Sequence, residues 1–144
     1  MGLYLDASVL LPGFFEESAS AAVEATIRGA ADQILVSDFA AAEVVSAVSR
    51  LVRMRLISVA DADARLSQFE VWRAATTAAA ELHAADARLA YTLVRRFDLM
   101  LRAPDALHLA IARRIDARLV TLDRRLSSAS AALGIAVEIP GGTS

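Results

Sequence analysis

LRAPDALHLAIARR, residues 101–114, is the stretch from which the architecture of this chain is most readily inferred. Pro104 suits the first position of a helix, where its missing N–H costs no hydrogen bond. Asp105 then falls in the first turn, where the helix dipole and free backbone N–H groups favour a carboxylate. The apolar residues that follow predict a buried helix: Leu107, Leu109, Ala110 and Ile111. Asp105 is therefore either a helix-terminal anion or a site residue, and other acids must distinguish the two.

The length and composition of the chain indicate one globular domain. It has 144 residues, of which 56% are hydrophobic, enough for one core and too few for two comfortable domains. No uncharged run approaches the ~18–20 residues of a membrane span. The first residues lack the basic stretch of a signal peptide. We expect a single domain over residues 1–139, a disordered tail over 140–144 and a cytoplasmic protein.

The residue types exclude several classes of site. The chain has no cysteine, so disulfide frameworks and thiolate metal sites are excluded. All 15 basic residues are arginines, and the Walker A phosphate loop requires a lysine. The formal charge is −6 over residues 1–87 and +4 over residues 88–144. This local basic region is a weak indication of nucleic-acid binding.

Short apolar runs alternate with amphipathic stretches along the chain. The alternation predicts an α/β domain with a mostly parallel sheet. We expect strands at about 3–6, 34–38, 117–123 and 135–139. We expect helices at about 16–28, from an N-cap at Asp38, from Ser58 through Trp72, and at 84–97, 101–114 and 124–133. Residues 74–82, rich in Ala and Thr, are not assigned.

Four acids fall where such a sheet binds ligands. Asp6 and Asp123 end predicted parallel strands, and ligands bind at that edge of open α/β sheets. Glu43 lies about one turn into the helix after the second strand, and Asp105 begins its own helix. The four carboxylates can therefore converge on one cleft, although the sequence alone does not demonstrate this.

Four clustered carboxylates would repel one another, which raises pKa values and destabilises the fold. A divalent cation removes the conflict. Carboxylate ligands without Cys or His suit Mg²⁺ or Mn²⁺ better than zinc. Such an ion activates water and shields a phosphate, as in metal-assisted phosphodiester cleavage. Two ions roughly 3.5–4 Å apart are typical, and one can suffice.

Four segments in this order carry a resemblance to a known family: LYLDASVL at 3–10, AAEVVSAV at 41–48, RAPDALHLAIA at 102–112 and LVTLDRRL at 119–126. Together they resemble the PIN-domain ribonucleases, and among these the VapC-like toxins of bacterial toxin–antitoxin pairs. The resemblance extends from Leu3 to about Val137. It implies a three-layer α/β/α sandwich, a homodimer, an RNA substrate and a cognate antitoxin that blocks the site.

The resemblance also implies roles for individual residues. Asp6, Glu43, Asp105 and Asp123 match the acidic quartet that binds Mg²⁺ or Mn²⁺. The family's hydroxyl positions correspond to Ser8 and Thr121. Some relatives carry a further acid shortly after the fourth, where this chain has arginines, Arg124 and Arg125.

Each candidate also has an ordinary structural explanation. Asp6, Ser8 and Asp123 can cap the helices that follow them. Glu43 can be a solvated helix residue, and Thr121 an ordinary strand residue. His108, one turn after Asp105, can approach the cleft, but within such an apolar helix it is expected in the core with a hydrogen bond to the backbone. It is not assigned as a general base, because a metal-activated water needs none.

The arginines and the apolar surplus have two interpretations each. Arg102, Arg124 and Arg125 can bind RNA phosphates or be solvated. One apolar set can form core or a groove for an antitoxin helix: Phe14, Phe15, Val23, Ile27, Leu51, Val52, Met54, Leu56 and Ile57.

Other classes fit less well. A haloacid-dehalogenase-like phosphohydrolase requires a second aspartate where this chain has Ser8, and a lysine, which is absent. A response-regulator receiver requires the same missing lysine. The alternative that stays open is a PIN-fold scaffold that binds protein or RNA without cleaving it.

Overall fold

The computed structural model describes residues 1–15 and 17–142. Five parallel strands form one sheet in the order β3-β2-β1-β4-β5. Their bounds are Leu3–Leu5 for β1, Ile34–Ser37 for β2, Ala78–Ala80 for β3, Arg118–Val120 for β4 and Val137–Glu138 for β5. The predicted α/β class and parallel sheet are confirmed.

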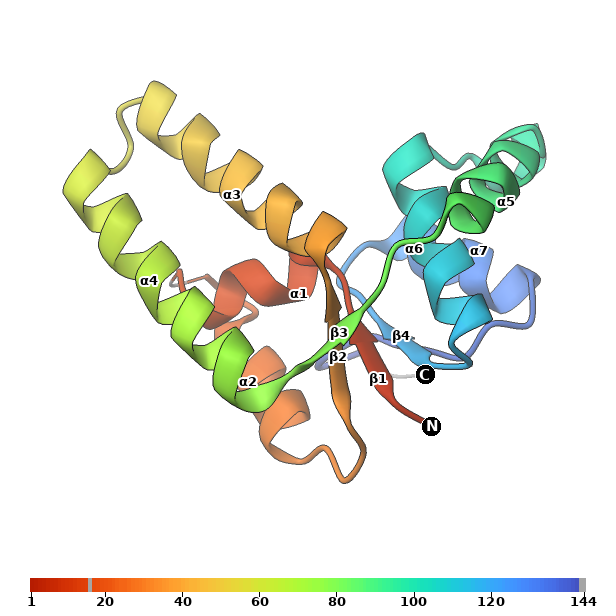
Figure 1. Cartoon of the computed structure of the whole chain (residues 1–144), viewed down its shortest axis with the longest axis horizontal. Coiled ribbons are helices and arrows are strands. Elements are labelled where there is room, and N and C mark those ends of the chain that lie inside the picture. Colours follow the sequence, from red (N-terminus) through yellow and green to blue (C-terminus); the bar gives the residue numbers. More distant parts are fainter. Residues whose placement is uncertain (16, 143–144) are drawn as a thin grey trace.

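In the described part of the chain, seven α-helices connect the strands (Figure 1). They are α1 (Ala7–Leu10), α2 (Ser20–Arg28), α3 (Asp38–Arg53), α4 (Val59–Thr76), α5 (Ala84–Val94), α6 (Ala103–Arg114) and α7 (Arg124–Ala132). Two 3₁₀ turns, η1 (Leu11–Gly13) and η2 (Phe97–Leu99), follow α1 and α5. No helix in the described part of the chain is both long and apolar enough to cross a membrane.

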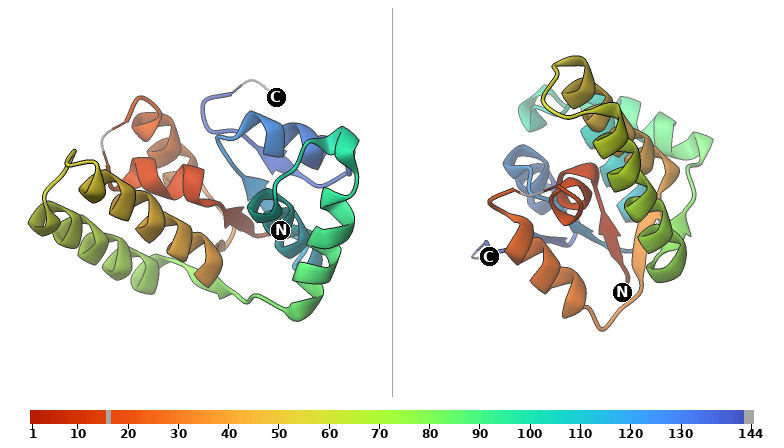
Figure 2. Two further views of the ribbon diagram at one scale, coloured as in Figure 1. Left: turned by 90° about the horizontal axis from the view of Figure 1, so that it is seen from above. Right: turned by 90° about the vertical axis from the view of Figure 1, so that its left-hand side faces the viewer.

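The sheet has helices on both faces, and the strand residues alternate between them. Leu3 and Leu5 pack with α1, α2, α3 and α4 on one face. Tyr4 and Leu119 pack with α5, α6 and α7 on the other. Figure 2 shows the two groups of helices on either side of the strands. This is the three-layer sandwich that the resemblance implied.

The structure corrects several predicted boundaries. The helix expected from about residue 16 is α2, which begins at Ser20; Glu16 itself lies outside the described residues, as do 143–144 of the predicted tail. The unassigned segment 74–82 contains the edge strand β3, which pairs with β2. An Ala-rich strand has little intrinsic β-propensity, so its pairing is a tertiary effect.

The N-cap of α3 is Ser37 and not Asp38. Ser37 Oγ accepts a hydrogen bond from Ala40 N at 3.0 Å. Asp38 is the first helical residue, exposed, and paired with Arg73 at 2.6 Å. Both residue types are good N-caps, so the sequence could not choose between neighbours.

The helix predicted around Asp105 is α6, and its Leu109 is fully buried. We expect Leu109→Ala to lower the free energy of unfolding by about 2–5 kcal/mol, because a cavity remains where the side chain packed. Val71→Ala, at a position that is 71% exposed on α4, should change it by less than about 0.5 kcal/mol. Urea unfolding at one protein concentration measures both, and equal midpoints would contradict this placement of the core.

Candidate active site

Asp6 lies directly after β1, at the edge where the parallel strands end, which we call the carboxyl edge. Its side chain is 4% exposed. Its backbone N–H donates to the carbonyl oxygen of Val120 at 3.3 Å, which joins β1 to the end of β4. The side chain makes no capping hydrogen bond to α1. The capping alternative for Asp6 is therefore wrong.

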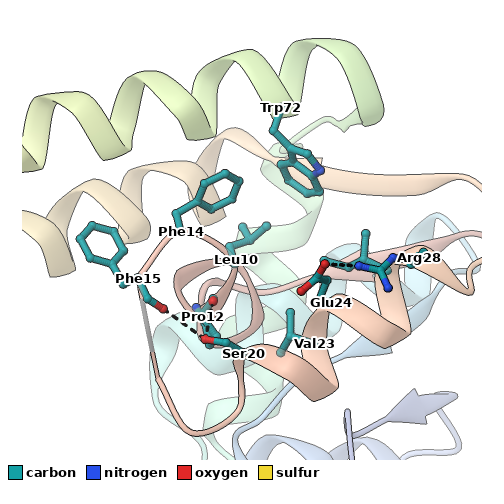
Figure 3. A pocket seen from close by; sticks show the side chains of 11 residues that line it. Leu10, Pro12, Phe14, Phe15, Ser20, Val23, Glu24, Arg28 and Trp72 are labelled. Carbon is teal, nitrogen blue, oxygen red and sulfur yellow. Dashed lines mark hydrogen bonds and ion pairs between the residues drawn. The ribbon is translucent and has the colours of Figure 1, made fainter.

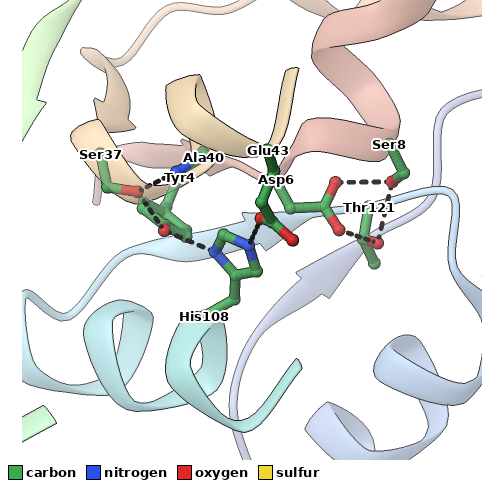
Figure 4. Close-up of polar contacts among 8 residues, drawn as sticks. All are labelled: Tyr4, Asp6, Ser8, Ser37, Ala40, Glu43, His108 and Thr121. Carbon is green, nitrogen blue, oxygen red and sulfur yellow. Dashed lines mark hydrogen bonds and ion pairs between the residues drawn. The ribbon is translucent and has the colours of Figure 1, made fainter. Parts of the chain in front are cut away.

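Two hydroxyl groups hold the Asp6 carboxylate (Figure 4). Ser8 Oγ donates to Oδ1 and Thr121 Oγ1 donates to Oδ2, each at 2.6 Å. Ser8 Oγ accepts from Leu122 N at 2.9 Å, and Thr121 Oγ1 accepts from Asp123 N at 3.0 Å. Both hydroxyls thus have fixed orientations, and together they tie the loop after β1 to the loop after β4. Ser8 is therefore not a helix cap, and Thr121 is not an ordinary strand residue.

Burial raises the pKa of Asp6, and the hydrogen bonds from Ser8 and Thr121 oppose this only in part. The side chain of Asp86, at the start of α5, is likewise almost inaccessible to solvent but has a different partner. Although burial opposes it, the Arg114 guanidinium at 2.8 Å holds the pKa of Asp86 below its ordinary value. Asp86 is therefore a compensated structural carboxylate, and Asp6 is not compensated by a cation in this way.

Asp105 lies in the first turn of α6, as predicted, although the helix begins at Ala103 and not at Pro104, and it accepts a hydrogen bond from Arg102 N at 3.2 Å. Burial raises its pKa, and the negative charges of Asp123 and Glu43 raise it further. These two acids, 18 and 62 residues from Asp105 along the chain, therefore act on its carboxyl group.

Asp123 has the capping role that its position allowed. Its Oδ1 accepts hydrogen bonds from Arg125 N and Leu126 N at 2.9 and 3.2 Å, at the start of α7. A cap of this kind uses one carboxylate oxygen. Capping and a role in the site are therefore compatible for this residue.

Glu43 is half-buried, and its Oε1 contacts His108 Nε2 at 2.5 Å. It is not the freely solvated residue of the alternative interpretation. His108 is buried, as expected, but its partners are side chains and not the backbone: Nδ1 contacts Tyr4 OH at 2.7 Å. Tyr4 OH also contacts Ser37 Oγ at 2.8 Å. Tyr4 and Ser37 are site-adjacent residues that the sequence did not reveal.

One signal in the sequence could have identified Tyr4. A tyrosine in a strand with both faces covered needs a partner for its O–H group, and Tyr4 is fully buried. The sequence could not name that partner, because His108 lies 104 residues away along the chain.

The donor chemistry of this edge fits a hard divalent cation. In residues 1–15 and 17–142, no Arg or His nitrogen lies within 4.0 Å of a carboxylate oxygen of Asp6, Asp105 or Asp123. Over the same residues, no three Asp, Glu or His side chains are already grouped as metal ligands. Within the described residues these three carboxylates have no cationic partner, and the sharing of one ion by the four acids stays a prediction.

The remaining candidates are arginines at the same edge. Arg102 precedes α6, and Arg124 and Arg125 begin α7. All three are exposed, which suits either of their interpretations. Their contact with RNA phosphates stays a prediction.

Two grooves contain residues that the sequence singled out. One, of about 590 Å³, includes Glu43 together with Arg50 and Arg53 of α3. The other, of about 540 Å³, is mainly apolar and lies between η1, α2 and α4 (Figure 3). Its lining includes Leu10, Pro12, Phe14, Phe15, Val23, Ile27 and Trp72. Part of the predicted apolar set thus lines this apolar groove, whereas Leu51, Met54 and Leu56 line the groove that includes Glu43, and Met54 and Leu56 are exposed there.

The raised pKa of Asp6 predicts a pH dependence of metal-free stability. A carboxyl whose pKa is raised by folding contributes stability below its unfolded pKa, and this is lost as pH rises through the folded pKa. In EDTA, Asp6→Asn should therefore gain stability relative to the unchanged protein as pH rises from about 4 to 8.

Asp86→Asn is the matched control with the opposite sign, because the pKa of Asp86 is lowered. Its stability relative to the unchanged protein should fall as pH rises toward the unfolded pKa of about 3.9, and should change little above about pH 5. Melting temperatures across the range measure both variants. A large loss of stability for Asp6→Asn at pH 8 would mean that its carboxylate is structural.

Comparisons with known proteins agree with this geometry. The PIN domain family model matches residues 3–132. No curated protein sequence matches the chain at a significant level. Similar solved structures include VapBC2 from Rickettsia felis bound to a promoter DNA fragment, with TM-score 0.71, 15% identity, and 96% of this chain and 98% of that chain covered.

Two further structures have the same fold. One is VapC20 of Mycobacterium tuberculosis, a toxin that cleaves the sarcin-ricin loop (TM-score 0.70, 15% identity, 88% of this chain and 94% of that chain). The other is FitAcB from Neisseria gonorrhoeae (TM-score 0.73, 17% identity, 98% and 99%). Because the family model spans nearly the whole sheet and the acids at its carboxyl edge, the chain belongs to the PIN domain family.

Proposed function

We propose that this chain is a Mg²⁺- or Mn²⁺-dependent endoribonuclease and the toxin of a toxin–antitoxin pair. The observation that carries the proposal is Asp6, a buried carboxylate held by two hydroxyls without an arginine partner in the described residues. A protein that only binds RNA or protein has no need for this arrangement, because burying an unpaired carboxylate lowers stability. The scaffold alternative does not account for it.

The proposed metal ligands are Asp6, Glu43, Asp105 and Asp123. A bound Mg²⁺ or Mn²⁺ supplies an activated water and neutralises charge on the phosphodiester. Ser8 and Thr121 keep the Asp6 carboxylate in one orientation, which lowers the cost of ordering it for an ion. The backbone N–H of Arg102, at the start of α6, likewise holds the Asp105 carboxylate in place.

The proposed RNA contacts are Arg102, Arg124 and Arg125, which flank the acids on exposed positions. Guanidinium groups pair with phosphates in a planar fork. Such contacts position a backbone without reading its sequence. They therefore suit a nuclease whose selectivity for its RNA lies elsewhere.

The proposed protein partners are a second copy of the chain and a cognate antitoxin. The apolar groove between η1, α2 and α4 (Figure 3) has the character of a surface that takes the apolar face of a partner helix. VapC20, which shares the fold, is described as a toxin. An antitoxin bound here would account for part of the hydrophobic surplus of the sequence.

The direct test is cleavage of RNA by purified protein with Mn²⁺. Asp105→Asn should reduce the rate by more than the roughly 100-fold that loss of an outer-shell group costs. Asp116→Asn is the matched control: Asp116 is exposed after the end of α6, with φ of 51°, a conformation that asparagine adopts readily. It should cleave like the unchanged protein. Equal cleavage by Asp105→Asn and the unchanged protein would place the activity in a contaminant or another site.

Phosphate contact is tested separately, in the cleavage-deficient Asp105→Asn background. Adding Arg124→Ala should weaken RNA binding and reduce the slope of log K against log salt by about 1. Arg28→Ala, on the exposed surface of α2 where Arg28 pairs with Glu24, should leave both unchanged. Unaltered binding by Arg124→Ala would return that side chain to the solvated surface.

A further inference from the structure

A chain of four hydrogen bonds ends on Glu43, one of the proposed metal ligands (Figure 4). It leads from Ala40 N to Ser37 Oγ at 3.0 Å, to Tyr4 OH at 2.8 Å, to His108 Nδ1 at 2.7 Å, and from His108 Nε2 to Glu43 Oε1 at 2.5 Å. Ser37 and Tyr4 are fully buried, and His108 is 3% exposed. These hydrogen bonds therefore connect the N-terminus of α3 to Glu43 of the same helix, by way of β1 and α6.

With Glu43 as a carboxylate and a single proton on the His108 ring, the two ends of this series of hydrogen bonds fix the direction of each one. Ala40 N–H can only donate, so Ser37 Oγ accepts it and has its own proton free for Tyr4. At the other end, an ionised Glu43 can only accept, so His108 Nε2 must carry a proton. A neutral imidazole then accepts at Nδ1, and Tyr4 O–H donates to it. Each donor and acceptor is satisfied once.

Other proton arrangements leave a group unsatisfied. A neutral imidazole with its proton on Nδ1 would turn the Nε2 lone pair toward the Glu43 carboxylate. A doubly protonated ring would donate to Tyr4, which would turn Tyr4 O–H to Ser37. The Ser37 proton would then lack an acceptor among the hydrogen bonds of the described residues. A buried donor without a partner is unfavourable.

The ring of His108 is also held by its neighbours. Its centroid lies 5.7 Å from the ring of Tyr4 and 5.3 Å from that of Phe39. Its Nε2–H is therefore aimed in one direction. The side chain of Glu43 is long and 30% exposed, so it would otherwise sample many rotamers.

We propose that His108, oriented by Tyr4 and Ser37, is a positioning residue that holds Glu43 by Oε1 and leaves Oε2 for the metal ion. This inference rests on the proposed function, since Glu43 is a ligand only if the site takes a cation. Fixing the rotamer before binding removes an entropic cost that the ion would otherwise meet. His108 and Tyr4 therefore raise the affinity for the metal without touching it.

The first test is calorimetric titration of the full chain with Mn²⁺ alone. His108→Leu should raise the Kd for Mn²⁺ by about 10- to 100-fold, the usual effect of removing a group that orients a ligand. His108→Gln keeps an N–H donor and should lose less. Tyr4→Phe keeps the ring and should weaken binding in the unchanged background, yet add nothing when combined with His108→Leu, because Tyr4 acts through His108.

Tyr91→Phe is the matched control, since it removes the same hydroxyl from a side chain that is 67% exposed; it should leave the Kd unchanged. An unchanged Kd in folded His108→Leu would overturn the proposal. Should His108→Leu fail to fold, Tyr4→Phe decides alone, and an unchanged Kd there has the same meaning.

A parallel RNA cleavage assay separates this inference from the proposed function. If the unchanged protein binds Mn²⁺ but does not cleave RNA, only the proposed function is wrong. If the unchanged protein cleaves RNA and the variants bind Mn²⁺ with the same affinity, only this inference is wrong. If the unchanged protein binds no Mn²⁺, both are wrong.

The second test needs no metal. The chain has two histidines, so ¹⁵N-labelled imidazole spectra contain two sets of signals, and exposed His83 serves as the reference. His108 should show a proton on Nε2 and none on Nδ1 at pH 8, and Glu43→Ala should weaken this preference, because it removes the acceptor that requires the Nε2 proton. A proton on Nδ1 in the unchanged protein would contradict the assigned direction of these hydrogen bonds.

Discussion

Uncompensated negative charge at the carboxyl edge of the sheet is the constraint on which the rest of this structure depends. The comparison of two buried aspartates makes this concrete. Asp86 has Arg114 within 2.8 Å and a lowered pKa, whereas Asp6 has two hydroxyls and a raised one. The same side chain is thus stabilised as an anion by a guanidinium in one place, and held only by hydroxyl groups in the other.

The topology explains why the charge collects at this point. With the order β3-β2-β1-β4-β5, β1 and β4 are neighbours although they are more than a hundred residues apart in sequence. Because all strands are parallel, the residues after them emerge at one edge. The Ser8 and Thr121 hydroxyls then tie the two emerging loops to the same carboxylate. Fold and site therefore share their hydrogen bonds, and a change to one affects the other.

Local features of the sequence were enough to predict the helix around Asp105 and the position of Asp6 after a strand. Pro104 and the apolar run behind it define α6, and the alternation of Leu3, Tyr4 and Leu5 defines two faces. Features that depend on pairing were not predictable. β3 is an alanine triplet whose strand conformation comes from β2, and the cap of α3 was placed one residue late.

The same distinction holds within the site. The acids at the carboxyl edge were predictable because strand ends and helix starts have local signatures. The partners of His108 were not, since Tyr4 and Glu43 come from elements far away in the sequence and meet only in the folded chain. Hydrogen-bond partners of buried polar groups are a property of the tertiary structure, and the sequence indicates only that partners must exist.

The most direct measurement of the central claim is the melting temperature of the unchanged protein and of Asp6→Asn as Mn²⁺ is added at pH 8. Without metal, Asp6→Asn should be at least as stable as the unchanged protein. As Mn²⁺ rises, the unchanged protein should gain stability, by about 2.7 kcal/mol at 100 times the Kd, and become the more stable of the two. Two melting temperatures that do not respond to Mn²⁺ would contradict the claim that these carboxylates are arranged for a divalent cation.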